Sequence, residues 1–419
     1  MIALRSTGML RATANVAGRY LGRAAMADGL QQNQGVPVVS CRRQELALSA
    51  PMMPPHLPSG LPQPPHDIRT NVADALRGFF RDRASLVEPV GTEFRSAVTH
   101  LEDFVLRGGK RVRPTFAWVG WLGAGGDVDA PGADNVLSAC ASLELIQACA
   151  LIHDDIIDNS RTRRGFPTIH VEFARQHRDQ GWGGDPESFG EAAGILIGDL
   201  ALAWADDMFH GSGIGTEAHQ RALPVWAAMR TEVLGGQLLD IVVESSGDGS
   251  HGSALKINRF KTAAYTVERP LHLGAAIAGA DDALIAAYRT FGADIGIAFQ
   301  LRDDLLGVFG DPATTGKPSG DDLRAGKRTA LLAYALETAD ANQPDVAATL
   351  RSAVGTELSE ADVDSLRSLI ISLGAVERVE KQIADLTERA LNALDASSAR
   401  PGTKDALHAM ALAVTRRTY

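Results

Sequence analysis

Three aspartates at helical spacing are the residues in this sequence best suited to chemistry. Asp154 and Asp158 are four residues apart, so both carboxylates emerge on one face of a helix, with Asp155 beside them. Carboxylates turned toward a core repel one another unless a cation neutralises them. Oxygen ligands suit a hard cation, and Mg²⁺ beside substrate phosphates is the usual arrangement. A solvated acidic helix end is the alternative, and apolar neighbours argue against it: Ala150, Leu151, Ile152, Ile156 and Ile157.

A second acidic pair, Asp303-Asp304, lies on another long apolar stretch, residues 281–309. An acid pair on a largely apolar helix repeats the logic of the first site, because such acids also need a cation or a partner. Other polar groups on the expected helices and on the glycine-rich loops after the second pair are Gln237, Asp240, Lys261, Thr262, Gln300, Lys317 and Lys327.

Two basic clusters are suited to phosphate. Residues 108–114 read Gly-Gly-Lys-Arg-Val-Arg-Pro, in which the glycines leave backbone N–H groups accessible and the proline fits the first turn of a helix. A helix N-terminus beside Lys110 and Arg113 attracts anions. The second cluster holds Arg163 and Arg164, and the arginine fork matches phosphate oxygens. Taken alone, the first cluster fits a basic loop equally well, and the second fits ion-pair partners of the aspartates.

Considered together, the two acid-bearing helices and the dispersed cations predict one cavity. Mg²⁺ ions and cationic side chains would grip diphosphates there, and apolar helix faces would form the remaining wall. That arrangement suits cleavage of a carbon–diphosphate bond and protection of the resulting carbocation from water.

Helical periodicity dominates from about Asp67 onward, and alternating β patterns are scarce. The clearest apolar stripe runs from Asp134 to Asp158, and the breaks fall at glycine- and proline-rich clusters. The sequence therefore predicts an all-α, single-domain bundle of ten or more helices over residues 67–419. The other helical stripes fit 69–82, 93–107, 112–124, 190–209, 217–244, 255–279, 281–309, 327–338, 358–372 and 375–396.

Composition narrows the class of protein. A formal charge of −10 over 419 residues argues against general affinity for nucleic acid or for an anionic membrane. Three cysteines without a CxxC pair favour a reducing cytoplasm over a disulfide framework. No uninterrupted apolar run approaches the roughly 20 residues that cross a bilayer, so stable membrane insertion is not expected.

The first 66 residues differ from the rest. Four arginines precede the first acid, Asp28, and seven prolines lie between Pro51 and Pro65. Such a segment buries little surface and forms no regular helix or strand. We expect a disordered extension or a start codon set too early, while the arginine-rich beginning also fits an organelle presequence.

These motifs resemble those of the trans-isoprenyl diphosphate synthase (polyprenyl synthetase) family. The run 154–158 followed by Arg163-Arg164-Gly165 is similar to the family's first aspartate-rich motif. Residues 109–114 resemble its isopentenyl diphosphate loop, and 300–304 resemble its second aspartate-rich motif, in the same order. The resemblance covers roughly Asp67 to the C-terminus.

The resemblance implies a helical bundle around a deep central cavity, the isoprenoid synthase fold, and a homodimer. The reaction would ionise an allylic diphosphate, attack the cation with the double bond of isopentenyl diphosphate, and lose a proton to the departing diphosphate. About three oxygen-ligated Mg²⁺ ions would be bound by Asp154, Asp155, Asp158, Asp303 and Asp304. Isopentenyl diphosphate would be held by Gly109, Lys110, Arg113, Gln147 and Arg164. The allylic substrate (dimethylallyl, geranyl or farnesyl diphosphate) would be held by Arg163, Lys261, Thr262, Gln300, Lys317 and Lys327.

One position departs from the family pattern. The second motif usually has a third aspartate four residues after the first, and this sequence has Gly307 there. Asp311 follows one turn later. Together with residues 266–274, the glycine resembles a subgroup of actinobacterial geranylgeranyl diphosphate synthases, so we expect activity to be retained.

Product length in this family depends on residues one turn before the first aspartate, which close the cavity floor. Here they are the small residues Cys149 and Ala150, which disfavour a fifteen-carbon product. Since one helical turn rises about 5.4 Å, close to one isoprene unit, Ile146 and Leu143 are the next barriers. We expect geranylgeranyl diphosphate or a longer product.

Two other functions are compatible with part of the pattern. A class I terpene cyclase shares one aspartate-rich motif and the all-α fold, but it does not need the loop at 109–113. A non-catalytic subunit of a heteromeric synthase tends to lose the first motif, which is intact here.

Overall fold

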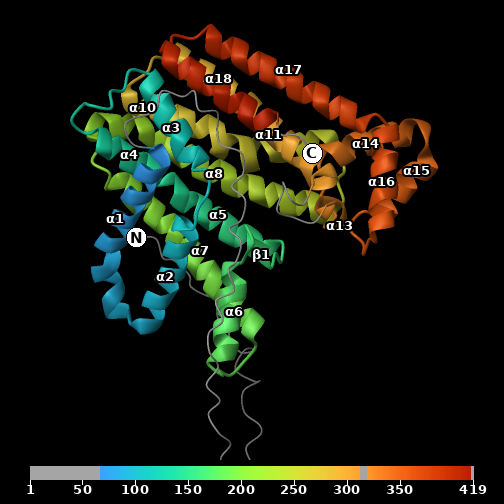
Figure 1. The fold of residues 1–419 in the computed structure, drawn as a ribbon, viewed down its shortest axis with the longest axis horizontal. Helices are drawn as coiled ribbons and strands as arrows, with labels where there is room; N and C mark the ends of the chain where they lie inside the picture. The colour runs from blue at the N-terminus through green and yellow to red at the C-terminus, as the bar shows by residue number, and fades with distance from the viewer. Residues whose placement is uncertain (1–66, 312–318, 417–419) are drawn as a thin grey trace, which may run out of the picture. The chain divides into compact units, whose positions relative to one another are not determined.

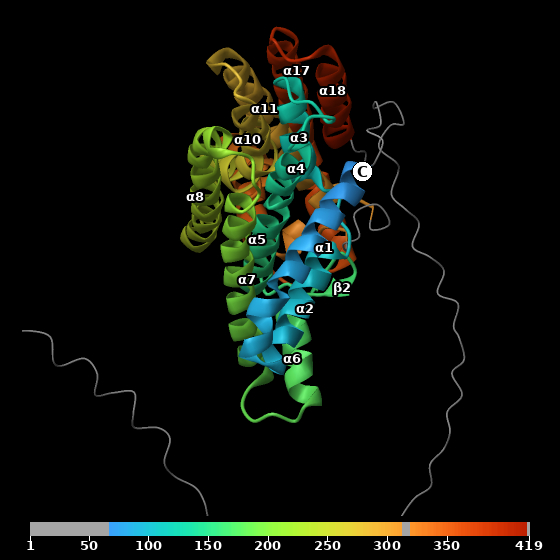
Figure 2. The ribbon, with the colours of Figure 1, turned by 90° about the vertical axis from the view of Figure 1, so that its left-hand side faces the viewer.

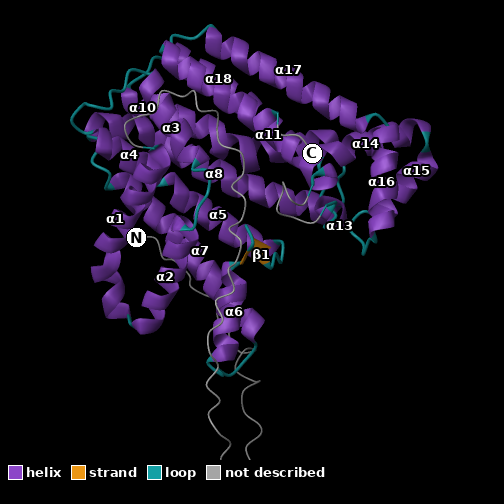
Figure 3. Ribbon diagram, in the orientation of Figure 1, coloured by secondary structure: helices purple, strands orange, loops and turns teal. Residues whose placement is uncertain are grey.

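The computed structural model describes residues 67–311 and 319–416, all within one unit, Pro54–Tyr419. The described part is almost entirely helical, with one short antiparallel strand pair (Figure 3). The expected all-α bundle of ten or more helices is confirmed for the described residues. The predicted extension at 1–66 lies outside the described residues.

The N-terminal half contains the helices around the first acid motif (Figure 1). They are α1 (Ile68–Val87), η1 (Glu88–Val90), α2 (Thr92–Leu106), α3 (Val112–Gly123), α4 (Ala133–Ala141), α5 (Leu143–Ile157), α6 (Ile169–Asp179), α7 (Pro186–His210) and α8 (Thr216–Ser246). Strands β1 (Thr162–Arg163) and β2 (Phe166–Pro167) form a hairpin between α5 and α6. Helix α5 packs against α7 and α8 (Figure 2).

The C-terminal half is built around α11 (Asp282–Phe309), along which the last two described helices pack (Figure 1). Its N-terminus is capped by Asp281, whose carboxylate accepts from Leu284 N at 2.8 Å. The other elements are α9 (His251–Ile257), η2 (Asn258–Glu268), α10 (Arg269–Ala278), α13 (Asp321–Arg324), α14 (Ala330–Asn342), α15 (Pro344–Ala353), α16 (Glu360–Ser372), α17 (Ala375–Asp395) and α18 (Pro401–Thr415).

Two expected helices are interrupted. The stripe from 134 to 158 divides at the buried Ser142, whose hydroxyl donates to the carbonyl of Ala139 at 2.6 Å. The stretch 255–279 contains a π-helix, η2, which is wedged between α8 and α11. A Cβ atom at Gly236 would lie 2.3 Å from Lys261 N, and one at Gly296 would lie 2.5 Å from Ala263 Cα. Glycines on both neighbours therefore give the wide π turn its room.

The most apolar helices bear on the expectation that the chain is not stably inserted in a membrane. Two helical stretches are long and apolar enough to cross a bilayer by length and composition alone. In Ala133–Ile157, 67% of the most apolar 18-residue window is buried, so its apolar residues serve mainly as core. In Pro186–His210, only 39% of the corresponding window is buried, so part of its apolar surface is uncovered within one chain.

Candidate active site

Side chains from three other elements contact the carboxylate of Asp154 on α5. Its Oδ1 lies 3.0 Å from Lys261 Nζ on η2 and accepts from Gln237 on α8 at 3.2 Å, while Oδ2 accepts from Arg163 at 3.3 Å. Burial raises the pKa of Asp154, but the charge of Lys261 and its hydrogen bond outweigh burial and leave the pKa below its usual value. Asp154 is therefore ionised at neutral pH.

Lys261 joins two acids. Besides Asp154, its ammonium contacts Asp240 on α8 at 2.5 Å. Burial alone would lower the pKa of Lys261, but the two carboxylates raise it instead, so this side chain keeps its charge. The wide turn of η2 places Lys261 and Thr262 between α8 and α11. A fixed cation at this position can bind an anionic group of a substrate.

Asp155, the next residue along α5, shares Arg163 with Asp154 but is buried more deeply. Only 1% of it is exposed, and both of its carboxylate oxygens accept from Arg163 Nε, at 2.8 and 2.9 Å. Burial raises the pKa of Asp155 despite the nearby guanidinium. The pair fixes the β1–β2 hairpin against α5. A part for Asp155 in metal binding stays a prediction.

The hairpin also joins the two basic clusters. Arg164 (φ +56°) and Gly165 (φ +80°) form its turn, and Arg164 Nη1 donates to Gly108 O at 3.3 Å, 56 residues away. Burial lowers the pKa of Arg164, and the charges of Arg163, Arg111 and Arg113 lower it further. Guanidinium groups that repel one another in this way are stabilised by a polyanion such as diphosphate.

The remaining basic-loop residues divide into two kinds. Arg111 is buried and pairs with the buried Glu144, so it anchors the start of α3. Arg113 donates to Thr266 Oγ1 at 2.9 Å and lies 3.9 Å above the ring of Tyr265. Lys110 is exposed on the loop, and Gln147 lies two turns before Asp154 on the same face of α5. The sequence did not single out Tyr265 as a site residue, although it lies one turn after Lys261.

On α11, the two acids of the second motif also differ. Asp304 is 3% exposed and accepts from Gln300 at 2.9 Å and from Ala330 N at 3.4 Å. Burial raises its pKa to about 7. Asp303 and Gln300 belong to the partly exposed face of this helix.

A chain of contacts connects the two motifs. Asp154 contacts Lys261, and the next residue, Thr262, donates to Gln300 at 2.9 Å; Gln300 in turn contacts Asp304. Lys327 adds a second link. Burial lowers its pKa, but Asp322, Asp158 and Asp154 raise it above its usual value. Acids from both halves of the fold thus face the same cations. Lys317 lies outside the described residues.

The donor set fits a hard, oxygen-preferring cation. Asp158 lies at the C-cap of α5, and burial together with the charge of Asp154 raises its pKa, a repulsion that a cation would relieve. Within residues 67–311 and 319–416, no three His, Cys, Asp or Glu side chains converge closely enough to hold a metal by themselves. Mg²⁺ commonly takes one or two protein carboxylates and completes its shell with water and substrate phosphate.

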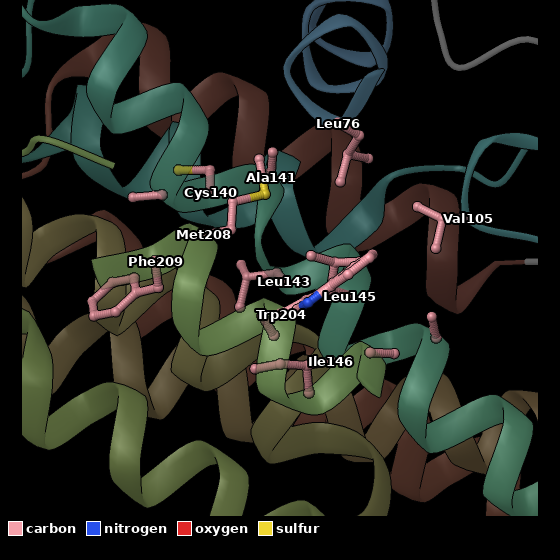
Figure 4. Packing of buried hydrophobic residues seen from close by; sticks show 14 of the residues in the cluster. Leu76, Val105, Cys140, Ala141, Leu143, Leu145, Ile146, Trp204, Met208 and Phe209 are labelled. Carbon is pink, nitrogen blue, oxygen red and sulfur yellow. The ribbon is translucent and has the colours of Figure 1, made fainter. Parts of the chain in front are cut away.

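The residues expected to set product length lie on different faces of α5. Leu143 and Ile146 are buried in the core, in which Trp204, Met208 and Phe209 of α7 also take part (Figure 4). Cys149 is buried too, with its sulfur 3.7 Å from His153 Nδ1. Ala150 is partly exposed, on the same face as Asp154.

The order of these motifs along the chain matches a known family. A sequence model described as polyprenyl synthetase matches residues 96–370. The chain belongs to the polyprenyl synthetase family. The predicted resemblance is confirmed over the helices that carry both acid motifs.

The relatives with named activities are prenyl diphosphate synthases. A geranylgeranyl pyrophosphate synthase from Corynebacterium glutamicum, crystallised with isoprenyl diphosphate and magnesium, is 51% identical with a TM-score of 0.80, covering 84% of this chain and 99% of its own. The geranylfarnesyl diphosphate synthase of Aeropyrum pernix is 34% identical over 68% of this chain and 83% of its own length. The geranylgeranyl diphosphate synthase of Mycobacterium tuberculosis is 31% identical over 67% and 75%.

These relatives show that this polyprenyl synthetase is a trans-prenyltransferase, as the sequence predicted. The actinobacterial similarity expected from residues 266–274 and Gly307 is confirmed by the Corynebacterium structure. Use of a divalent metal is supported by that structure and by a Caulobacter crescentus polyprenyl synthase crystallised with calcium.

Proposed function

We propose that this polyprenyl synthetase condenses isopentenyl diphosphate with an allylic diphosphate, in the presence of Mg²⁺, to give geranylgeranyl diphosphate or a longer trans-polyprenyl diphosphate. The observation that carries the proposal is the contact chain from Asp154 on α5, through Lys261 and Thr262, to Gln300 on α11. Both acid motifs then face one allylic diphosphate, while the arginine cluster at the hairpin remains for a second diphosphate.

Each group has a distinct part in the reaction. When bound, Mg²⁺ neutralises the diphosphate that leaves the allylic carbon. Asp154, Asp158 and Asp303 would hold about three such ions at oxygen ligands, and Lys261 and Lys327 would orient the same diphosphate. Arg113, Arg164 and Lys110 would hold isopentenyl diphosphate so that its double bond faces the allylic carbon. The released diphosphate accepts the proton in this scheme.

The test is a product assay with labelled isopentenyl diphosphate and dimethylallyl, geranyl or farnesyl diphosphate as separate primers. Labelled products of twenty carbons or more, abolished by EDTA and restored by Mg²⁺, are expected. A terpene cyclase would instead consume a long allylic diphosphate alone, and a non-catalytic subunit would turn over neither. No observation in the described residues favours either alternative.

Ala150→Phe is expected to shorten the product. The Ala150 side chain lies on the partly exposed face of α5, one turn before Asp154, and an aromatic ring there would fill the path of the growing chain. Chromatography of the products should show a shift from twenty carbons toward fifteen. Cys149→Phe is the companion variant, because Cys149 is buried beside His153 on another face of α5; an unchanged product length from it would assign the floor to the face of Ala150. An unchanged product from Ala150→Phe would place the floor elsewhere.

The proposal includes a homodimer formed through α7 and α8. Six of the thirteen exposed large apolar side chains of the described residues lie on these two helices: Ile195, Leu196, Leu223, Leu234, Leu238 and Val242. Leu234, Leu238 and Val242 recur every four residues, so they make one apolar stripe along α8. A second copy of the chain would cover the same stripe in a two-fold arrangement.

Leu238→Glu should therefore produce monomers. The side chain is 62% exposed in one chain, so the charge costs little within the fold but would be buried at the interface. Light scattering after gel filtration is the measurement, with the exposed Ile371→Glu on α16 as control. A dimer that persists in Leu238→Glu would exclude this surface as the dimer interface.

In the same proposal the enzyme is cytoplasmic, in keeping with the free, buried Cys140 and Cys149.

A further inference from the structure

Gly307 occupies the place of the missing third acid of the second motif, and that place is already filled. A Cβ atom at Gly307 would lie 1.9 Å from Oδ2 of Asp322 and 2.4 Å from its Cγ. Even alanine would collide there. The carboxylate of Asp322 therefore occupies the space just outside α11 into which a side chain at 307 would project.

Asp322 reaches this space from α13, a short helix that follows Gly320 (φ +76°). Its side chain is 14% exposed. Leu323 anchors the helix in the C-terminal core at 2% exposure, and Arg324 donates to Ser319 O at 2.6 Å and to Glu360 at 2.7 Å. The position of the Asp322 carboxylate is thus fixed by the packing of Leu323 and by the hydrogen bonds of Arg324.

The surroundings of Asp322 are those of the acid site. Its Oδ1 lies 3.9 Å from Lys327 Nζ, and its backbone carbonyl accepts from Lys327 N at 3.0 Å. Burial raises the pKa of Asp304 on α11, and the negative charge of Asp322 raises it further; for Lys327, burial would lower the pKa, and Asp322 is the main opposing charge. Gly307 is one turn after Asp303 on the partly exposed face of α11, so Asp303 and Asp322 lie on the same side of that helix.

We propose that Asp322, on α13 of the same chain, supplies the third carboxylate of the second acid motif. Glycine is then required at 307 to leave room for the Asp322 side chain. The inference rests on the proposed function, since the ligand is the Mg²⁺–diphosphate bound there. The oxygens of Asp322 would bind Mg²⁺ or its water ligands, as oxygen donors of a hard cation do. Substrate binding would then also fix the loop that carries Lys327.

Asp311, an acid that follows Gly307 closely in the sequence, is not placed to supply the third carboxylate. Asp311 follows Gly307 by four residues, but α11 ends at Phe309 and Gly310 is extended (ψ 142°). Asp311 is exposed beyond that end. It therefore serves as the matched control for removal of one carboxylate near the site.

The experiment measures binding of Mg²⁺ with inorganic diphosphate by calorimetry and by the rise in melting temperature. Asp322→Asn should bind about 10- to 100-fold more weakly, while Asp311→Asn should equal the wild type. Gly307→Asp alone should be destabilised by the collision, and the exchange Gly307→Asp with Asp322→Gly should recover both folding and binding.

The outcomes separate this inference from the proposed function. Wild-type affinity in Asp322→Asn would overturn the inference while leaving chain elongation intact. If Asp322→Asn does not fold, the double variant Gly307→Asp with Asp322→Gly is the deciding measurement. A folded double variant that does not bind Mg²⁺ with diphosphate would overturn the inference, and one that binds it as the wild type does would support the inference. A wild-type protein that binds no Mg²⁺–diphosphate and makes no product would instead refute the proposed function.

Discussion

Asp154→Asn is expected to lower kcat/KM by about 10²- to 10³-fold, the loss typical when one electrostatic stabiliser of a transition state is removed. Asparagine has the same shape but lacks the charge that holds the metal ions and orients Lys261. The fold should survive, because the side chain is 18% exposed and Lys261 keeps its second partner, Asp240. The Mg²⁺ concentration for half-maximal rate should rise as well.

Initial rates at several Mg²⁺ concentrations give both quantities. Asp129→Asn, an exposed acid in the α3–α4 connection, is the control for a lost negative charge and should match the wild type. If Asp154→Asn kept most of the wild-type kcat/KM, metal binding at α5 would not be part of the reaction.

Arg163→Met should be the most destabilising single change at the site, by about 3–5 kcal/mol, since it leaves a buried carboxylate without its partner. Asp155 is 1% exposed and takes its hydrogen bonds from this guanidinium. The double variant with Asp155→Asn should recover much of the loss, because no buried charge then remains. Urea unfolding measures each step.

The loss should also depend on pH. Burial raises the pKa of Asp155 in the folded protein, so the folded state binds more protons than the unfolded state as pH rises past the ordinary aspartate range. The free energy of unfolding of Arg163→Met should therefore fall from pH 5 to pH 8. Arg77→Met, which removes an exposed pair with Asp74, should change stability by less than about 1 kcal/mol at any pH. A comparable loss in both variants would contradict a buried role for Arg163.

Local periodicity predicted most of the helices, because each buries one continuous apolar stripe. The stretch 281–309 agrees with α11 to within one residue. The π-helix η2 could not be predicted in this way, since it depends on glycines such as Gly236 and Gly296 on neighbouring helices. Those contacts join residues far apart in the sequence.

The candidate site also combines features that the local sequence predicts with features that depend on tertiary contacts. The sequence predicted that Asp154 faces the site, whereas the burial of Asp155 against Arg163, a residue that both aspartates contact, depends on the hairpin between α5 and α6. The hairpin that joins Arg164 to Gly108, and the filling of the space at Gly307 by Asp322, are tertiary contacts without a local signal.

The proposed reaction requires the acids of α5 and α11 to bind one metal–diphosphate cluster. A crystal structure of the wild type with Mg²⁺ and a non-cleavable allylic diphosphate analogue tests it directly. We expect Asp154 and Asp303 to be bound, at about 2.0–2.1 Å, to Mg²⁺ ions that share the same diphosphate. Metal and analogue held by one helix alone, with the other acid motif away from the diphosphate, would contradict it.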